Sequence, residues 1–235
     1  MRRTALALAL IFCALIPGAA SAAKARQPVV VELFTAQGCS SCTGAGKVLD
    51  GLADRPGVLA LTLGVDYWNY LGWADTFAKP EYTSRQKAYV RRLSNGDVYT
   101  PQVIVDGRAE AAGADQKKID SLIRQARRAK APGPKVRWLR RGRVEVAAGH
   151  APPGGADVWL LRYDPGVQEV AVDKGENRGR KIRERNVVRQ LVHLGRWRGK
   201  ARAYAAPASP SGDMLRTAVL VQGSNGGRIL AVAQH

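Results

Sequence analysis

The strongest constraint on the fold is the spacing of apolar residues from Gln27 to Lys130, where stretches typical of strands alternate with stretches typical of helices. Apolar, β-branched runs with the length of buried strands lie at 28–34, 58–65 and 102–105. Stretches with apolar residues at helical spacing lie at 42–55, 80–93 and 115–126. An Asp106-Gly107 turn predicts a hairpin with a short return strand through Ala111. The resulting order, β-α-β-α-β-β-α, predicts an α/β domain whose helices cover a sheet.

The pattern changes after the Pro/Gly-rich stretch at 131–134, which we interpret as a linker or domain boundary. Short apolar runs separated by turn residues follow, and they predict a small β-sandwich or sheet. One predicted strand, Val158 to Tyr163, is expected to end at Asp164-Pro165-Gly166. The sequence therefore predicts two domains, at 23–130 and 131–235.

Residues 1–22 have the pattern of an export signal. Arg2 and Arg3 precede an apolar run, and Ala20-Ser21-Ala22 forms a small-residue cleavage site. Cys13 lies inside this segment and is expected to leave with it. The sequence thus predicts an exported protein, either periplasmic or secreted.

The chain carries a formal net charge of +18, and most of the excess lies beyond Lys130, densest from Arg178 to Arg202. A surface of this kind attracts nucleic acid, anionic lipid headgroups or acidic proteins. Export argues against nucleic acid as a partner. We therefore expect either an anionic surface of the cell envelope as a partner of the C-terminal domain or a solvated basic face that binds nothing.

Cys39 and Cys42, separated by Ser40 and Ser41, stand between the first predicted strand and the first predicted helix. Two thiols at this spacing are typical of a dithiol/disulfide redox centre, and so short a loop adds little as a structural staple. Unpaired N–H groups at the start of a helix favour a thiolate at Cys39. We predict that Cys39 attacks, that Cys42 resolves the mixed disulfide, and that this redox-active disulfide is the only cofactor.

Thr100 and Pro101 begin the strand that is expected beside the cysteine pair. A cis peptide bond before Pro101 would leave the preceding backbone free to pair with a substrate chain, although trans is far commoner for such bonds. Glu32, inside the first strand, is predicted either to accept the proton of Cys42, if it is buried, or to face water from an edge strand. Asp66, at the end of the second strand, competes for the role of proton acceptor.

An aromatic segment follows the second strand and includes Tyr67, Trp68, Tyr70 and Trp73. Such side chains suit a substrate-facing groove beside a redox pair, and they more often serve as packing. Tyr67 and Trp68, which lie next to Asp66, are the two that we include among the supporting site residues.

Other uses of the cysteine pair stay open. The pair can be an inert structural disulfide, or it can bind Cu(I), which two thiolates hold. A structural zinc site is not predicted, because zinc normally takes four protein ligands. The histidines of the chain are scattered at His150, His193 and His235.

Several motifs together resemble the DUF1223 family of exported bacterial proteins of unknown function, which are similar to thioredoxin-like proteins. These motifs lie at residues 31–42, 65–68, 70–73, 99–102, 157–160, 175–177, 179–180 and 186–188. The resemblance implies a thioredoxin fold for the first domain, with Cys39 attacking, Cys42 resolving and Pro101 as the cis proline. It implies no substrate. Thr43 and Gly64 depart from the family pattern, which commonly has proline and histidine there, and such a histidine would stabilise a thiolate or bind a metal.

The sequence as a whole predicts a thioredoxin-like α/β domain followed by a smaller β-rich C-terminal domain. The function that it favours is an exported thiol–disulfide oxidoreductase that exchanges disulfides with a protein partner through Cys39 and Cys42. The alternatives are an envelope binding protein with a structural disulfide and a protein that binds or delivers Cu(I).

Overall fold

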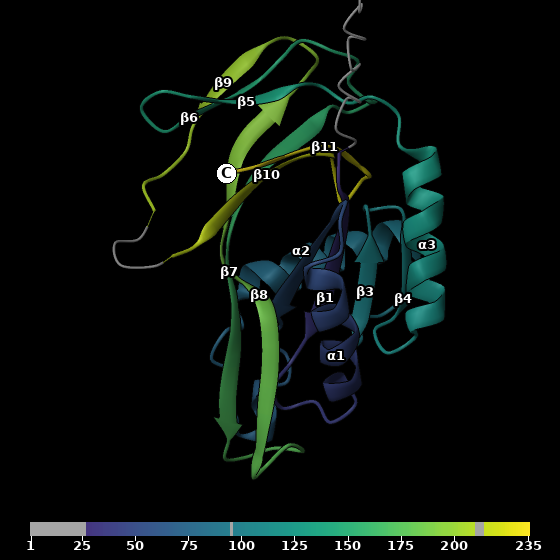
Figure 1. The fold of residues 1–235 in the computed structure, drawn as a ribbon, viewed down its shortest axis with the longest axis vertical. Helices are drawn as coiled ribbons and strands as arrows, with labels where there is room; N and C mark the ends of the chain where they lie inside the picture. Colours follow the sequence, from purple (N-terminus) through teal and green to yellow (C-terminus); the bar gives the residue numbers. More distant parts are fainter. Residues whose placement is uncertain (1–26, 95, 210–213) are drawn as a thin grey trace, which may run out of the picture.

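The computed structural model describes residues 27–94, 96–209 and 214–235 (Figure 1). The predicted export signal, residues 1–22, lies outside the described residues. The first half of the chain contains β1 (Val29–Thr35), α1 (Cys42–Ala53), β2 (Val58–Gly64), the 3-10 helix η1 (Asn69–Leu71), α2 (Pro80–Leu93), β3 (Gln102–Val105), β4 (Ala109–Ala112) and α3 (Gln116–Ala129). This is the predicted order of strands and helices, with one added 3-10 turn.

The second half of the described chain contains strands only, in agreement with the predicted β-rich character. They are β5 (Val136–Leu139), β6 (Arg143–Val146), β7 (Ala156–Val172), β8 (Arg180–Trp197), β9 (Arg202–Ala205), β10 (Arg216–Gly223) and β11 (Ile229–Gln234). Two of them, β7 and β8, are far longer than the short strands that the sequence predicts, with 17 and 18 residues.

Eight strands form one mixed sheet in the order β11-β10-β7-β8-β2-β1-β3-β4, and β5-β6-β9 form a second sheet. β1 and β2 are parallel, and β3 is antiparallel to β1. β2 also pairs in parallel with β8, so both halves of the chain share the large sheet. The predicted α/β class is therefore confirmed as a large mixed sheet with a second sheet. The division into two domains near residue 131 stays a prediction.

The β7–β8 hairpin is the main departure from the predicted elements. The sequence predicts a strand end at Asp164-Pro165-Gly166, but β7 continues to Val172. The register between the two strands shifts between Asp164 and Val167, so the turn residues form a bulge within the strand. A bulge tolerates proline because its extra residue leaves the ladder of hydrogen bonds. The hairpin therefore runs on past α1 as one long ribbon (Figure 1).

β1 is buried on both faces and separates two cores. Val31 and Leu33 pack in the core that includes Leu49 of α1 and the apolar stripe of α3. Phe34 lies in the other core, where its ring meets the ring of Tyr89 of α2 edge to face at a centroid distance of 6.2 Å. Because side chains alternate along a strand, α1 and α3 cover one face and α2 covers the other. The turn after β1 is thus held between two packed layers.

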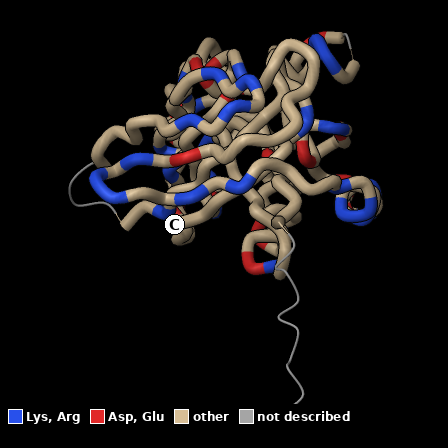
Figure 2. The backbone as a smooth tube through the Cα atoms, turned by 90° about the horizontal axis from the view of Figure 1, so that it is seen from above, with Lys and Arg blue, Asp and Glu red and all other residues tan. Residues whose placement is uncertain are grey.

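Lys and Arg are spread over the described chain, and Asp and Glu are fewer (Figure 2). Around the tip of the β7–β8 hairpin the exposed basic residues are Lys174, Arg178, Arg180, Lys181 and Arg183. This agrees with the charge excess that the sequence places in this region. None of the described helices combines the length and the apolar character that crossing a membrane requires.

Candidate functional site

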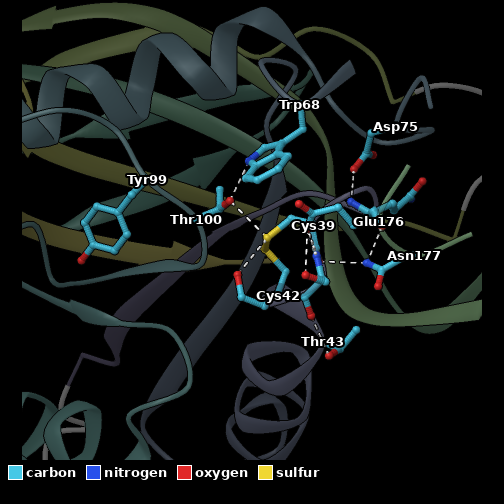
Figure 3. The surroundings of a disulfide bond; sticks show 12 residues. Cys39, Cys42, Thr43, Trp68, Asp75, Tyr99, Thr100, Glu176 and Asn177 are labelled. Carbon is cyan, nitrogen blue, oxygen red and sulfur yellow. Dashed lines mark hydrogen bonds between the residues drawn. A yellow bond between two sulfur atoms is a disulfide. The ribbon is translucent and has the colours of Figure 1, made fainter. Parts of the chain in front are cut away.

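Cys39 and Cys42 are joined by a disulfide where the chain turns from β1 into α1 (Figure 3). Their Cα atoms lie 5.5 Å apart. α1 begins at Cys42 with Ser41 as its N-cap, so Cys39 precedes the helix instead of occupying its first turn. Both cysteines are buried, with exposed fractions of 0% for Cys39 and 4% for Cys42. Groups outside the helix are therefore close enough to contribute to the stability of a thiolate at Cys39.

Two hydroxyl groups donate hydrogen bonds to the sulfur of Cys39. A disulfide sulfur carries no hydrogen, so Ser41 Oγ is the donor at 3.2 Å and Thr100 Oγ1 is the donor at 3.4 Å. Trp68 Nε1 donates to Thr100 Oγ1 at 2.7 Å, which leaves the Thr100 hydrogen free for the sulfur. The peptide bond between Thr100 and Pro101 is cis. In the reduced protein the same hydroxyls would stabilise a thiolate.

The tip of the β7–β8 hairpin covers the turn that holds Cys39 (Figure 3). Glu176 accepts hydrogen bonds from Ser40 N at 2.9 Å and Ser40 Oγ at 2.8 Å, and these bonds lower the pKa of Glu176. The side-chain amide of Asn177 donates to the carbonyls of Gln37 at 2.8 Å and Cys39 at 2.9 Å. Asn177 is fully buried, and its Oδ1 has no partner within the described chain. Sequence reasoning singled out neither residue for the site.

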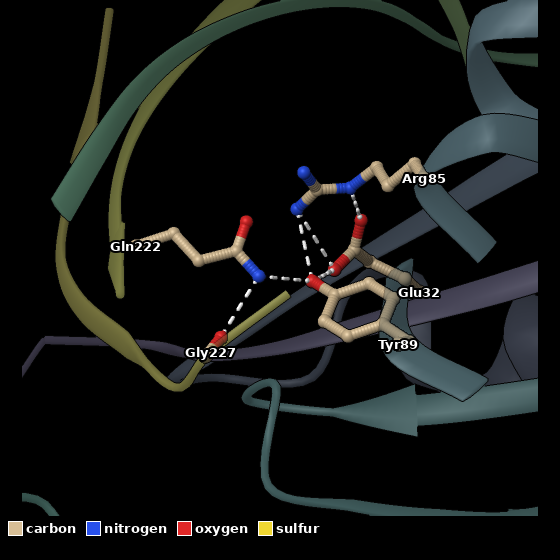
Figure 4. Close-up of polar contacts among 5 residues, drawn as sticks. All are labelled: Glu32, Arg85, Tyr89, Gln222 and Gly227. Atoms are coloured by element: carbon tan, nitrogen blue, oxygen red, sulfur yellow. Dashed lines mark hydrogen bonds and ion pairs between the residues drawn. The ribbon is translucent and has the colours of Figure 1, made fainter. Parts of the chain in front are cut away.

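Glu32 is fully buried in β1, a central strand, so the alternative of an edge-strand glutamate facing water is wrong. Its carboxylate accepts hydrogen bonds from Arg85 Nε at 2.6 Å and from Tyr89 OH at 2.5 Å (Figure 4). Gln222 Nε2 donates to the same tyrosine oxygen at 3.0 Å. Burial raises the pKa of Tyr89. None of the hydrogen bonds of Glu32 within the described residues reaches the cysteine pair.

The other predicted supporting residues divide between site and scaffold. Trp68 reaches the disulfide through Thr100. Tyr67 packs against the core, and burial raises the pKa of its phenol to about 12. Asp66 accepts a hydrogen bond from Thr83 Oγ1 of α2 at 2.6 Å. Asp66 therefore ties the end of β2 to α2.

A buried carboxylate that sequence reasoning missed, Glu184 of β8, does lie at the site. It lines the same cavity as Cys39 and Cys42, and Gln37 Nε2 donates to it at 3.3 Å. Burial, and repulsion from Asp75, raise the pKa of Glu184 to about 8. Within the described residues it forms no ion pair. At neutral pH it is therefore largely a protonated, neutral acid.

The sequence does contain a signal for Glu184. Residues of β8 alternate, so Ile182, Glu184 and Asn186 are buried while Lys181 and Arg183 are exposed. The high density of basic residues in this stretch suggests a solvated face, and with that interpretation the alternation of buried and exposed positions goes unnoticed. The inward position of Glu184 follows only once the stretch is known to be a strand.

The two departures from the family pattern have local explanations. A Cβ added to Gly64 would lie 3.0 Å from the backbone nitrogen of Ala78, so glycine permits the close approach of this segment to β2. Thr43 Oγ1 donates to the carbonyl of Ser40 at 3.1 Å, within the turn of the cysteine pair. Within the described chain no three side chains of His, Cys, Asp or Glu gather at one place.

Comparisons with known proteins extend this description. The model of a family described as a protein of unknown function, DUF1223, matches residues 30–222. An X-ray crystal structure of a protein from Agrobacterium tumefaciens is 33% identical, covers 89% of this chain and 94% of that chain, and has a TM-score of 0.72. HBP35 of Porphyromonas gingivalis is 14% identical, covers 90% of this chain and 76% of that chain, and has a TM-score of 0.55, a likeness of fold alone. No curated protein matches the chain.

Proposed function

Because this chain belongs to the DUF1223 family, whose description leaves the activity open, we propose a function from the site itself: an exported thiol–disulfide oxidoreductase that exchanges disulfides with a protein partner through Cys39. Its first half, with the element order that the resemblance implies, would be a thioredoxin-like domain. The charge of the C-terminal half would favour an anionic surface of the cell envelope as a second partner.

The observation that carries this proposal is the pair of hydroxyl donors on the sulfur of Cys39. Ser41 and Thr100 both donate to this sulfur, and Trp68 orients Thr100. A disulfide that serves only as a staple has no need of donors to one sulfur, because neither sulfur is charged. A sulfur that becomes a thiolate in each cycle gains stability from every donor.

The exchange begins with the Cys39 thiolate. It attacks one sulfur of a partner disulfide, forms a mixed disulfide and releases the other partner sulfur as a thiolate. Cys42 then loses its proton, attacks the Cys39 sulfur, closes the protein disulfide and releases the second partner thiolate. Glu184, in the same cavity, takes this proton when its carboxyl is ionised, which is the minor form at neutral pH, and water takes it otherwise. The partner gains two electrons and the protein loses two.

A Cys42→Ser variant tests this function, because it removes the resolving thiol and leaves the mixed disulfide in place. Extracts of cells that express the variant should contain partners linked to Cys39, released by reductant on a gel. The matched control is Cys39→Ser, which should link none. Absence of linked partners in the Cys42→Ser variant, with Cys39 shown to be alkylated in the reduced protein, contradicts the proposal.

One observation favours a second candidate, a binding protein with a purely structural disulfide. Cys39 is completely buried, so no partner reaches its sulfur without movement of the residues around it. In that case the pair stays oxidised in cells under all conditions, and a variant lacking both cysteines keeps its fold and its partner. Alkylation and gel shift of the thiols in living cells separate the two candidates.

A further inference from the structure

A cavity of about 160 Å³ lies between α1 and β8, beside the disulfide. Its inner wall contains Cys39, Cys42, Asn177 and Glu184. Its outer lining includes three exposed basic residues, Lys47, Lys181 and Arg183. This volume is well below the roughly 300–1,000 Å³ of pockets for drug-sized ligands. The cavity therefore suits a group about the size of one amino acid, and its lining includes both cysteines but not Thr100.

The inner wall offers an acceptor that the protein itself does not use. Asn177 is fully buried, both of its amide hydrogens are committed to backbone carbonyls, and its Oδ1 has no partner within the described chain. A buried acceptor without a partner is unfavourable, and a ligand N–H group would satisfy it. Because Oδ1 has almost no accessible surface in the structure, a ligand N–H group next to the reactive atom would reach it after a small movement of Asn177 or of the residues that cover it.

The outer lining favours a negative charge on the same ligand. Lys47 and Lys181 form no ion pair within the described residues, whereas Arg185 is already paired with Asp50 and Asp54. Arg183 is 3.8 Å from Glu169, and both of these side chains are largely exposed. Cationic groups that converge on a narrow entrance raise the local concentration of anions.

We propose that this cavity binds a small thiol of the cysteine type, with an N–H group beside the thiol and a carboxylate at the other end, and that this thiol reduces the Cys39–Cys42 disulfide. The proposal rests on the function proposed above and names the reductant for one half of its cycle. The N–H group would pair with Asn177 Oδ1, and the carboxylate would lie near Lys47 and Lys181.

The thiol attacks Cys42, the more accessible of the two cysteines. The thiolate of the small molecule forms a bond to Cys42 Sγ, the bond between the two cysteines breaks, and Cys39 leaves as a thiolate. Ser41 and Thr100 stabilise that leaving group, and a more stable leaving thiolate departs faster. A second small thiolate then attacks the sulfur of the bound small molecule in the mixed disulfide. Cys42 is released as a thiolate, which takes a proton from Glu184 or water. The two small thiols are thereby oxidised to one small disulfide, and the protein disulfide gains two electrons.

In this mechanism the small reductant and the protein partner react at different cysteines of the disulfide. The small reductant enters between α1 and β8 and reacts at Cys42. The Cys39 thiolate is left on the side of Thr100, Pro101 and Trp68, where the protein partner is expected.

The experiment is stopped-flow reduction of the purified, oxidised protein by three thiols compared at equal thiolate concentration. N-acetylcysteine has an amide N–H and a carboxylate, mercaptopropionate has a carboxylate only, and mercaptoethanol has neither. We expect N-acetylcysteine to react about tenfold faster than mercaptoethanol, with mercaptopropionate between them. Peptide mapping after acid quenching should find the mixed disulfide on Cys42.

Charge-reversal variants test the entrance. The double variant Lys47→Glu/Lys181→Glu should lose the preference for the two anionic thiols, while Lys87→Glu, an exposed reversal on α2 outside the cavity, should keep it. Thr43→Trp, which fills the cavity from α1, should slow all three thiols about tenfold or more. The charge variants preserve the test if the larger side chain disturbs folding.

Equal rates for the three thiols, or a mixed disulfide found on Cys39, overturn the small-thiol site. If the Cys42→Ser variant still links protein partners in that case, the oxidoreductase function stands without it. If instead the thiols discriminate as expected and Cys42→Ser links no partner, the cavity assignment holds and the protein-exchange function fails.

Discussion

Replacing Glu184 with glutamine is expected to remove most of the pH dependence of the unfolding free energy between mildly acidic and mildly alkaline pH. The carboxyl is buried, and burial together with repulsion from Asp75 raises its pKa from 4.5 to about 8 in the folded protein. One pKa unit corresponds to about 1.4 kcal/mol, so the folded state disfavours the charged form by about 5 kcal/mol relative to the unfolded chain.

The sign follows from which state holds the proton. Below pH 4.5 the carboxyl is protonated in both states, and this source of stability is fully present. Between pH 4.5 and about 8 only the unfolded chain releases the proton, so stability falls by about 1.4 kcal/mol for each pH unit. Above the folded pKa both states are ionised and the decrease ends.

Urea unfolding with the disulfide intact measures this effect. From about pH 5 to about pH 8 the wild-type protein should lose about 4 kcal/mol from this residue, and Glu184→Gln should lose only the part that belongs to other groups such as Asp75. Glu169→Gln is the matched control, because Glu169 is exposed on the same hairpin. An identical slope in wild type and Glu184→Gln would refute the assignment of a buried, neutral acid at this position.

Three further substitutions test other parts of the structure. Thr100→Val should slow alkylation of the reduced protein about threefold at neutral pH, because a loss of thiolate of up to about tenfold is partly offset by higher nucleophilicity; Thr217→Val, far from the site, should leave the rate unchanged. Asn177→Ala should cost about 1–3 kcal/mol in urea unfolding, because the buried carbonyl of Gln37 loses its donor and that of Cys39 keeps only the Cys42 N–H, and a cost within error of zero contradicts the described bonds. Arg85→Met should cost about 3–5 kcal/mol by leaving the Glu32 carboxylate unpaired, and most of that loss should be recovered when Glu32→Leu is added; no recovery would mean that the ion pair is not the cause.

Much of the first half of the fold could be predicted because its signals are local. The buried stripe of α3, at Ile119, Leu122, Ile123 and Ala126, follows from helical spacing alone. The disulfide of Cys39 and Cys42 joins residues only three positions apart, so its closure depends on one turn. The pairing of β1 with β2 joins consecutive strands, which are commonly neighbours, whereas the pairing of β1 with β3 is not local.

The candidate site could be predicted only in part, because several of its members come from distant positions in the chain. Asn177 and Glu184 meet Gln37 across 140 and 147 residues. The pattern around Glu32 indicates burial or an edge, but nothing near it in sequence indicates Arg85 as its partner. Asp164-Pro165-Gly166 has the composition of a turn, yet it forms a bulge because the flanking strand pairs continue on both sides.

The local period of apolar residues is set by whether successive side chains fall on one face of a helix or alternate across a strand, and it can be recognised in a short stretch of the chain. It determines the elements of the first half of the chain, the position of the cysteine pair at the end of β1, and those candidate residues that lie near the pair in sequence. Whether β8 pairs with β2, and therefore whether Glu184 and Asn177 reach the disulfide, depends on which distant surfaces bury each other best. That competition is decided by packing of the whole chain against the entropy of closing long loops, and only the tertiary structure shows its outcome.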